Sequence, residues 1–168
     1  MAKSYGQKAK LLYLLKIFKE LTDEENSLSL KEITEILNNE YDIKAERKSL
    51  YDDIETLKML DFDICTTRDK TTRYFLASRD VQLPELELLI DAVQASRFIS
   101  YDKSITLIKK LQTLASKHQA KKLYRGVYIS DSTKSKNQTT YYAIDAIHES
   151  IAKGHKLTFH YFTYNEKK

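Results

Sequence analysis

The spacing of apolar residues changes from a helical period to an alternating one within the first 77 residues, and this change constrains the fold most strongly. Apolar residues recur every three or four positions in the segments 8–21, 29–39 and 45–60. Because residues at that spacing share one helix face, these segments predict three amphipathic helices. In the segment 64–77 the apolar residues alternate with polar ones, so a β-hairpin should follow the third helix.

The second of these helices has its own start and stop signals. Ser29 stands three residues before Glu32, the arrangement in which serine caps a helix and glutamate reaches back to the capping amide. We expect the helix to end near Asn38 and Asn39, because asparagine tolerates the left-handed backbone found at helix ends. The turn then covers 41–43. Across the three helices, the side chains expected to face the core are Leu11, Leu12, Leu14, Leu15, Phe18, Leu21, Leu30, Ile33, Ile36, Leu37, Leu50, Ile54, Leu57 and Leu60.

Three helices closed by a charged hairpin are the arrangement typical of a winged helix-turn-helix domain, which we expect over residues 1–77. In such a domain the third helix enters the major groove of duplex DNA, and the hairpin, or wing, lies along the adjacent backbone. The exposed start of the third helix should therefore contact DNA. Its candidate residues are Lys44, Arg47, Lys48, Ser49 and Tyr51. An ordinary solvated helix face is the alternative interpretation.

The tip of the predicted hairpin supplies a second set of cations, at Arg68, Lys70 and Arg73. At least two of them can point to one side of a hairpin, where contact with phosphates adds affinity without sequence information. A charged turn is also what any exposed hairpin carries. Near the start of the chain, Lys8 and Lys10 are either a basic arm on the DNA backbone or part of a disordered terminus.

Beyond residue 77 the sequence predicts a helical connector. A fourth helix over 83–98 begins with Pro84 and Glu85 in its first turn, where proline and negative charge are favourable. A fifth helix over 100–118 should form an antiparallel hairpin with the fourth. The residues on its apolar side are Ile105, Ile108, Leu111 and Leu114. The stretch 119–140 has the composition of a loop or linker.

The last part of the sequence looks like the opening of a further domain. A sixth helix over 141–153 is followed by Gly154, a residue suited to a helix C-terminus, and alternation over 156–164 predicts a strand. The sequence given stops soon after that strand, so we expect an α+β domain of which only the start is present. The fold class is therefore mainly α with a small β component. We expect three parts: a winged helix-turn-helix domain (1–77), a helical hairpin connector with its linker (78–139) and the truncated start of an α+β domain (140–168).

A resemblance to a known family agrees with this order of elements. The run that begins Arg47-Lys-Ser-Leu-Tyr-Asp-Asp and continues to Ile64 resembles the recognition helix and following strand of transcription regulators that carry a C-terminal WYL domain. The segments 29–37, 83–86 and 144–164 are similar, in turn, to the second helix of these regulators, to their helical connector and to the opening of the WYL domain. The resemblance implies a bacterial regulator whose effector-sensing domain is largely missing from this sequence.

The sequence departs from that family at three points. It contains no Trp, so the tripeptide for which the domain is named is absent. It has Asp52-Asp53 where the family often has Arg-Asp, and Asp61 where the family often has Gly. The first of these differences removes an arginine that could contact a phosphate.

Composition excludes several classes of protein. With 42% hydrophobic and 31% charged residues, the chain fits a soluble, helix-rich globular protein better than a disordered one. The apolar run near the start is interrupted by lysines, so neither a signal peptide nor a membrane span is expected, and a cytoplasmic location follows. The single cysteine, Cys65, is expected to be a plain buried residue. No cofactor or metal is expected, and the scattered histidines suggest no catalytic site: His118, His148, His155 and His160.

The expected partner is double-stranded DNA, bound by a homodimer in which paired recognition helices match two half-sites. One observation favours a different partner: residues 1–77 hold 13 Lys and Arg against 15 Asp and Glu. A winged-helix module that docks on another protein is therefore the alternative function. A third interpretation assigns single-stranded nucleic acid binding to the aromatic residues at Tyr141, Tyr142, Phe159, Tyr161, Phe162 and Tyr164, although a core strand is the more ordinary interpretation of that alternation.

Overall fold

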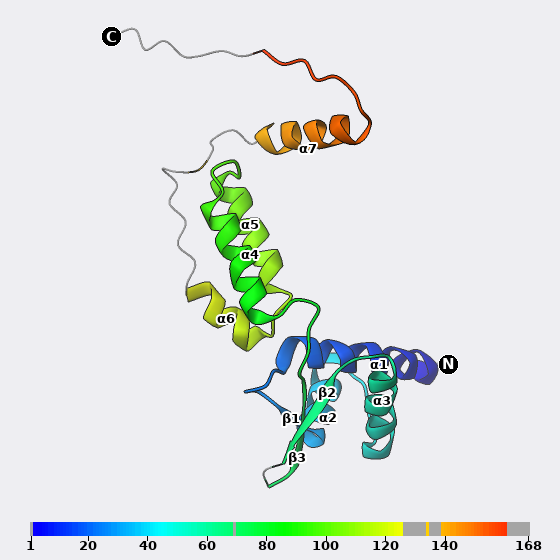
Figure 1. Cartoon of the computed structure of the whole chain (residues 1–168). Coiled ribbons are helices and arrows are strands. Elements are labelled where there is room, and N and C mark those ends of the chain that lie inside the picture. The colour runs from blue at the N-terminus through cyan, green and yellow to red at the C-terminus, as the bar shows by residue number, and fades with distance from the viewer. Residues whose placement is uncertain (1, 69, 126–133, 135–138, 161–168) are drawn as a thin grey trace.

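The computed structural model describes residues 2–68, 70–125, 134 and 139–160. These residues form seven helices and one three-stranded antiparallel sheet, so the predicted class, mainly α with a small β component, is confirmed (Figure 1). The described part of the chain contains no helix with the length and apolar character needed to cross a membrane.

The first 76 residues form three helices and the sheet. The sheet has the order β1-β3-β2, and its central strand β3 pairs with β2 in the register Ile64 to Leu76. The hairpin formed by β2 and β3 agrees with the prediction. Strand β1 was not predicted, because two residues are too few to show a period. The elements are α1 (Ala2–Leu21), β1 (Leu28–Ser29), α2 (Leu30–Tyr41), α3 (Arg47–Met59), β2 (Ile64–Arg68) and β3 (Thr72–Leu76).

Helix α2 is capped at both ends by its own residues. At the start, Ser29 Oγ accepts a hydrogen bond from the Glu32 amide (3.3 Å), and the Glu32 carboxylate accepts one from the Ser29 amide (2.7 Å). This confirms the predicted capping box. The helix continues to Tyr41, beyond the predicted end at Asn39, because Asp42 adopts the left-handed backbone (φ 53°) and its amide donates to the Asn38 carbonyl.

One apolar core joins α1, α2, α3 and the hairpin. Its fully buried members are mostly residues predicted to face inward: Leu14, Phe18, Ile33, Leu37, Leu50, Ile54 and Leu57, together with Ile17. The prediction was wrong for Leu12, which is 69% exposed on the outer face of α1, and for Leu60, which is 58% exposed. Leu60 lies outside the core because α3 ends at Met59.

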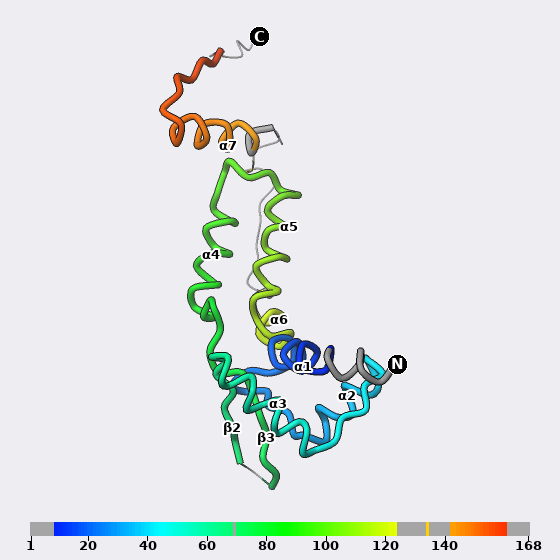
Figure 2. The backbone as a smooth tube through the Cα atoms, turned by 90° about the vertical axis from the view of Figure 1, so that its right-hand side faces the viewer, coloured from blue at the N-terminus to red at the C-terminus, as the bar shows by residue number. Residues whose placement is uncertain are grey.

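The middle of the chain forms a helical hairpin with a second, smaller core. Helices α4 (Leu83–Ala95) and α5 (Tyr101–Gln112) run side by side and antiparallel, and α6 (Lys117–Arg125) crosses their base close to α1 (Figure 2). The helix predicted over 100–118 ends at Gln112, and α6 occupies the start of the stretch predicted as a linker. Ser116 caps α6 by accepting a hydrogen bond from the Gln119 amide (3.0 Å). Leu114 therefore lies in a turn and is 43% exposed. The second core consists of Leu86, Ile90, Ile108, Ala115 and Leu123.

Polar contacts attach this hairpin to the N-terminal part. The Ser116 hydroxyl donates to the carboxylate of Asp23, and both residues are buried. Two ion pairs lie beside this contact, Lys117 with Glu20 (2.9 Å) and Lys122 with Glu25 (2.6 Å). Helix α6 is thereby fixed to the end of α1 and to the loop that follows it.

The C-terminal part contains helix α7 (Thr139–Ala152), close to the predicted range, and Gly154 follows it with φ 64°. The strand predicted over 156–164 is not formed at 156–160, whose residues are exposed and lie beside no other described strand. The remainder of that strand, including Tyr161, Phe162 and Tyr164, lies outside the described residues. In the predicted linker, Lys134 is buried, and its ammonium donates to the carbonyls of Val93 and Ser96 at the end of α4 (2.7 Å each).

Candidate nucleic-acid interface

The exposed start of α3 carries most of the side chains proposed to reach DNA. The helix begins at Arg47 after Glu46, whose backbone is extended and whose side chain makes no capping hydrogen bond. Lys44, Arg47 and Lys48 are all exposed. Three cations therefore lie at or just before the first turn of α3. The carboxylate of Glu46 does not cap the amides of that turn.

Arg47 is held in place by its neighbour one turn later. Its guanidinium donates to the Tyr51 hydroxyl (3.1 Å) and lies 5.8 Å from the centre of the Tyr51 ring. Behind them, Tyr74 of β3 is buried; burial first, and then the nearby Tyr51, raises the pKa of the Tyr74 hydroxyl. Tyr51 thus lies between a cation of α3 and a strand of the hairpin.

Ser49 occupies a different environment from the other α3 candidates. It is half-buried, and its hydroxyl accepts a hydrogen bond from the ammonium of Lys10. The same ammonium forms an ion pair with Asp53 (2.7 Å), and its side chain is only 4% exposed. Lys10 is therefore an interior residue of the N-terminal part, in contrast to the basic arm considered above. Asp53 therefore contacts α1 of its own module. The side chain of Lys8 lies outside the described residues.

The three cations of the hairpin lie in two different environments. Arg68 and Lys70 are exposed at the tip. Arg73 lies one residue pair further from the tip and is half-buried; its guanidinium donates to the Ser27 carbonyl (2.6 Å) and pairs with Glu32 (3.1 Å). The hydrogen bond from the Ser29 amide, followed by the contacts with the Ser29 hydroxyl and Arg73, lowers the pKa of Glu32 against the opposing effect of burial. By strand register, Arg68 lies opposite Thr72 and Arg73 opposite Thr67, so the two arginines are on opposite faces of the hairpin.

A groove of about 290 Å³ lies between the start of α2, the start of α3 and the tip of the hairpin. Among the described residues, its lining includes two cations, Lys31 and Arg47, several hydroxyl groups from α2 and the hairpin, and no carboxylate. Four lining residues were not predicted, because only the packing of α2 against the hairpin brings them beside α3: Lys31, Thr34, Thr71 and Thr72. The lining residues are Ser29, Leu30, Lys31, Thr34, Arg47, Tyr51, Thr71, Thr72 and Tyr74.

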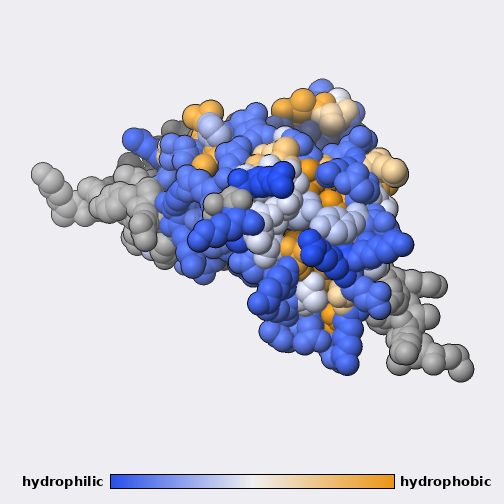
Figure 3. Space-filling view, turned by 90° about the horizontal axis from the view of Figure 1, so that it is seen from below, coloured by the Kyte–Doolittle hydropathy of each residue, from blue (hydrophilic) through white to orange (hydrophobic). Residues whose placement is uncertain are grey.

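The negative sum over residues 1–77 is explained by where the acidic residues lie. Among the described residues, six of these carboxylates form ion pairs with lysine or arginine, and one of the six, Glu35, pairs with the groove residue Lys31 (3.9 Å). The six are Glu20, Glu25, Glu32, Glu35, Asp53 and Glu55. In contrast, five candidate cations form no ion pair with a described residue: Lys44, Arg47, Lys48, Arg68 and Lys70. The end of the molecule seen in Figure 3 is mostly hydrophilic, with several separate apolar spots.

Side chains suited to metal binding or nucleophilic chemistry do not gather in the described part of the chain. No group of three or more His, Cys, Asp or Glu residues there could hold a metal ion. Burial first, and then the neighbouring Asp63, raises the pKa of the Cys65 thiol, which disfavours the reactive thiolate. Tyr142 and Phe159 are exposed at the C-terminal end, at 72% and 80%.

Comparison of the whole chain with protein-family models, with curated proteins and with solved structures found no match to any of them.

Proposed function

We propose that this protein is a DNA-binding transcription regulator whose residues 1–77 act as a winged helix-turn-helix domain. Helices α2 and α3 would be the helix-turn-helix pair, and β2 with β3 the wing. The observation that carries the proposal is the groove between α2, α3 and the hairpin, whose described lining residues combine cations with hydroxyls and include no carboxylate. Phosphate oxygens are bound by groups of this kind.

Some cations of this surface would add affinity by contacting phosphates, and one would recognise the base sequence. Lys44, Lys48, Arg68 and Lys70 are exposed and free of ion pairs with described residues, which suits contact with phosphates. Arg47 is the candidate for base contact, because a guanidinium can donate two parallel hydrogen bonds to guanine. Tyr51 would support Arg47 by holding its guanidinium before DNA binds.

Two of the residues predicted to contact DNA take supporting roles in this proposal. Arg73 joins the hairpin to Ser27 and Glu32. Ser49 receives the hydrogen bond from Lys10, which joins α3 to α1. Both would act on DNA through the position of the elements they hold.

Regulation is proposed from the resemblance and from the arrangement of the chain. The helical hairpin of α4 and α5 would separate the DNA-binding domain from a WYL-like domain that begins near residue 140. An effector would act through the remainder of that domain. The regulator would bind as a homodimer in the cytoplasm, so that two copies of α3 reach half-sites about one helical turn apart. No catalytic step is assigned to it.

A protein-docking module is the second candidate, because residues 1–77 have more acidic than basic residues. The two functions differ in their response to salt. We would titrate a fluorescent random duplex with the full chain between 50 and 300 mM salt and follow its anisotropy. Binding to phosphates should weaken linearly on logarithmic axes, with a slope of roughly −4 to −5 for five phosphate contacts. Failure to bind the duplex at low salt would favour the docking function.

A further inference from the structure

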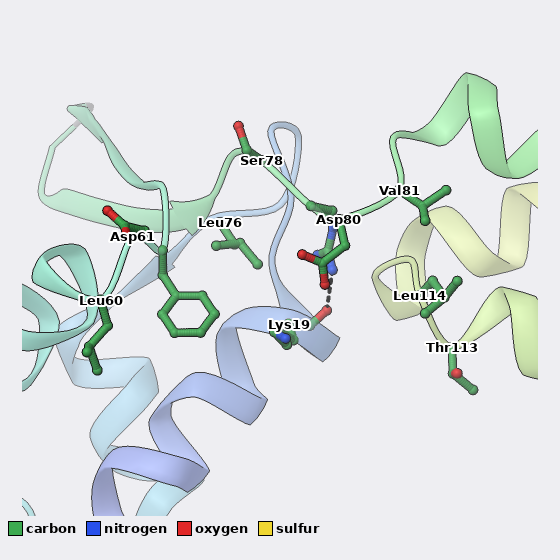
Figure 4. Close-up of a pocket in the computed structure, with 11 residues that line it drawn as sticks. Lys19, Leu60, Asp61, Leu76, Ser78, Asp80, Val81, Thr113 and Leu114 are labelled. Carbon is green, nitrogen blue, oxygen red and sulfur yellow. Dashed lines mark hydrogen bonds between the residues drawn. The ribbon is translucent and has the colours of Figure 1, made fainter.

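A second cavity, of about 500 Å³, opens where the N-terminal part meets the helical hairpin. One wall comes from the end of α1 and the turn after α3, and the other from the α5–α6 turn; the segment that leads from β3 into α4 runs between them. In Figure 4, Leu60 and Asp61 lie on one side, Val81, Thr113 and Leu114 on the other, and Asp80 between them. Its volume is within the range that drug-sized ligands occupy, roughly 300–1,000 Å³.

The walls of this cavity expose apolar side chains to solvent. Leu60 is 58% and Leu114 43% exposed, and Phe62, Leu76 and Val81 also line the space. Leu60 and Leu114 lie on opposite sides of the cavity and, with the other apolar lining residues, present apolar surface that a ligand could bury (Figure 4). The walls therefore fit a ligand with an apolar body.

The two cations that line the cavity, Arg79 and Lys19, both contact other groups of the protein. The Arg79 guanidinium is half-buried and donates to the carbonyls of Lys19 (2.8 Å) and Thr22 (2.7 Å) at the end of α1. The Lys19 ammonium lies over the Phe62 ring, 5.4 Å from its centre. Both cations thus have partners in the protein.

The two carboxylates of the cavity lack such partners. Asp61 and Asp80 are exposed, and neither side chain accepts a hydrogen bond or forms an ion pair with any residue that the structure describes. Two carboxylates that have no partner among the described residues lie beside apolar walls. Together they favour a ligand that is both cationic and apolar.

Asp61 also has an unusual backbone, with φ 64°. It follows the end of α3, where its amide donates to the Lys58 carbonyl and the Phe62 amide to the Leu57 carbonyl (3.1 Å each). Because asparagine tolerates the same left-handed backbone, Asp61→Asn removes the charge and keeps this helix end.

We propose that this junction cavity binds a small organic cation with an apolar body, an alkyl- or arylalkylammonium compound. The ammonium group pairs with Asp80 and Asp61, and the apolar body lies between Leu60 and Leu114. Such a ligand contacts the N-terminal part and the helical hairpin together, so it stabilises one arrangement of the two. Binding at this site is independent of the proposed contact with DNA.

The test uses the full ¹⁵N-labelled chain and three probes of equal shape: 4-phenylbutylammonium, the neutral 4-phenylbutanol and the anionic 4-phenylbutanoate. Saturable shifts of the Asp61, Ser78, Asp80 and Thr113 amides should appear, with the ammonium binding more tightly than either counterpart. Because exposed ion pairs are weak, Asp80→Asn should raise the dissociation constant about three- to fivefold, and Asp61→Asn should act in the same direction. Asp145→Asn, the same charge change on α7, should leave it unchanged.

Four results would overturn the proposal. They are equal binding of the three probes, shifts centred on other residues, an equal loss for Asp80→Asn and Asp145→Asn, and absence of saturation up to about 20 mM ammonium probe. The melting temperature of each variant is measured alongside, and Asp61→Asn decides the outcome if Asp80→Asn does not fold.

Discussion

Lys10 of α1 and Asp53 of α3 form an ion pair inside the N-terminal part, with Nζ and Oδ2 2.7 Å apart and side chains only 4% and 19% exposed. The same ammonium reaches the hydroxyl of Ser49. Because Arg47 lies at the start of the same helix, this contact fixes how α3 sits on α1 and therefore how its exposed face is presented.

Removing the lysine from this pair should be costly. In Lys10→Met the Asp53 carboxylate stays in a poorly solvated position without its cation, and we expect the free energy of unfolding to fall by about 2–4 kcal/mol. Lys16→Met is the matched control, since the pair of Lys16 with Glu20 is longer (3.8 Å) and exposed, and its loss should cost less than about 0.5 kcal/mol. Urea denaturation compares the two. Similar losses in both variants would contradict a structural role for the Lys10–Asp53 pair.

The two strand arginines of the hairpin, Arg68 and Arg73, should differ in how much their loss lowers the free energy of unfolding, measured again by urea denaturation. Arg73→Ala breaks contacts with Ser27 and Glu32, and we expect a loss of about 1–2 kcal/mol in unfolding free energy. Arg68→Ala removes an exposed side chain and should change that energy by less than about 0.5 kcal/mol. A greater loss of stability for Arg68→Ala would contradict the division of roles between them.

The elements of this fold were largely predictable because their signals are local. The apolar period of α2 and its Ser29–Glu32 capping box act over a few residues, and both appear in the structure where the sequence placed them. The end of α5 at Gln112 and the helix α6 after it were missed, because the apolar periodicity of α5 continues into the turn. Ser116 interrupts it through a contact with Asp23, a residue far away in the sequence.

The candidate site was less predictable than the fold. Exposure of Arg47 and Lys48 followed from the helical period, which places them outside the apolar stripe. The inward positions of Lys10 and Arg73 did not follow, because a lysine or arginine is buried only when a partner from another element meets it. Those partners are fixed by the packing of α1 on α3 and of the hairpin on α2.

Replacing Asp42, the residue that ends α2, with glycine should increase the stability of the protein. Asp42 ends α2 with φ 53°, a backbone that costs an aspartate more than a glycine. Asp42→Gly should therefore raise the free energy of unfolding by about 0.5–1 kcal/mol, whereas Asp42→Ala should lower it. Thermal unfolding followed by circular dichroism measures both. Destabilisation by glycine as large as that by alanine would show that the Asp42 side chain itself is needed.

Asp23 should make the chain sensitive to acid. Burial alone would raise its pKa, but hydrogen bonds from Ser116, Asn26 and Glu25 outweigh that effect and lower the pKa below its ordinary value of 3.8. A lowered carboxylate pKa gives stability that is present above the unfolded pKa and is lost as pH falls through the folded one. Asp23→Asn should cost about 1–2 kcal/mol at pH 7 and progressively less as the pH approaches 3.

The control for Asp23 is Glu24→Gln, which removes an exposed charge from the neighbouring position. Its effect should be small at both pH values, because an exposed carboxylate without such hydrogen bonds has a similar environment in the folded and unfolded chain. A constant difference between Asp23→Asn and the wild type from pH 7 to pH 3 would contradict the assigned contribution of the Asp23 charge.

The most direct test of DNA binding is the salt dependence of duplex affinity in two matched double variants. Arg68→Ala with Lys70→Ala removes two cations from the hairpin tip, and Lys109→Ala with Lys110→Ala removes two from the last turn of α5. If the hairpin contacts phosphates, the first pair should reduce the slope of log affinity against log salt by about 1–2, and the second should leave it unchanged. Equal slopes in the two double variants, or no salt-dependent binding by the wild type, would contradict the proposed winged-helix contact with DNA.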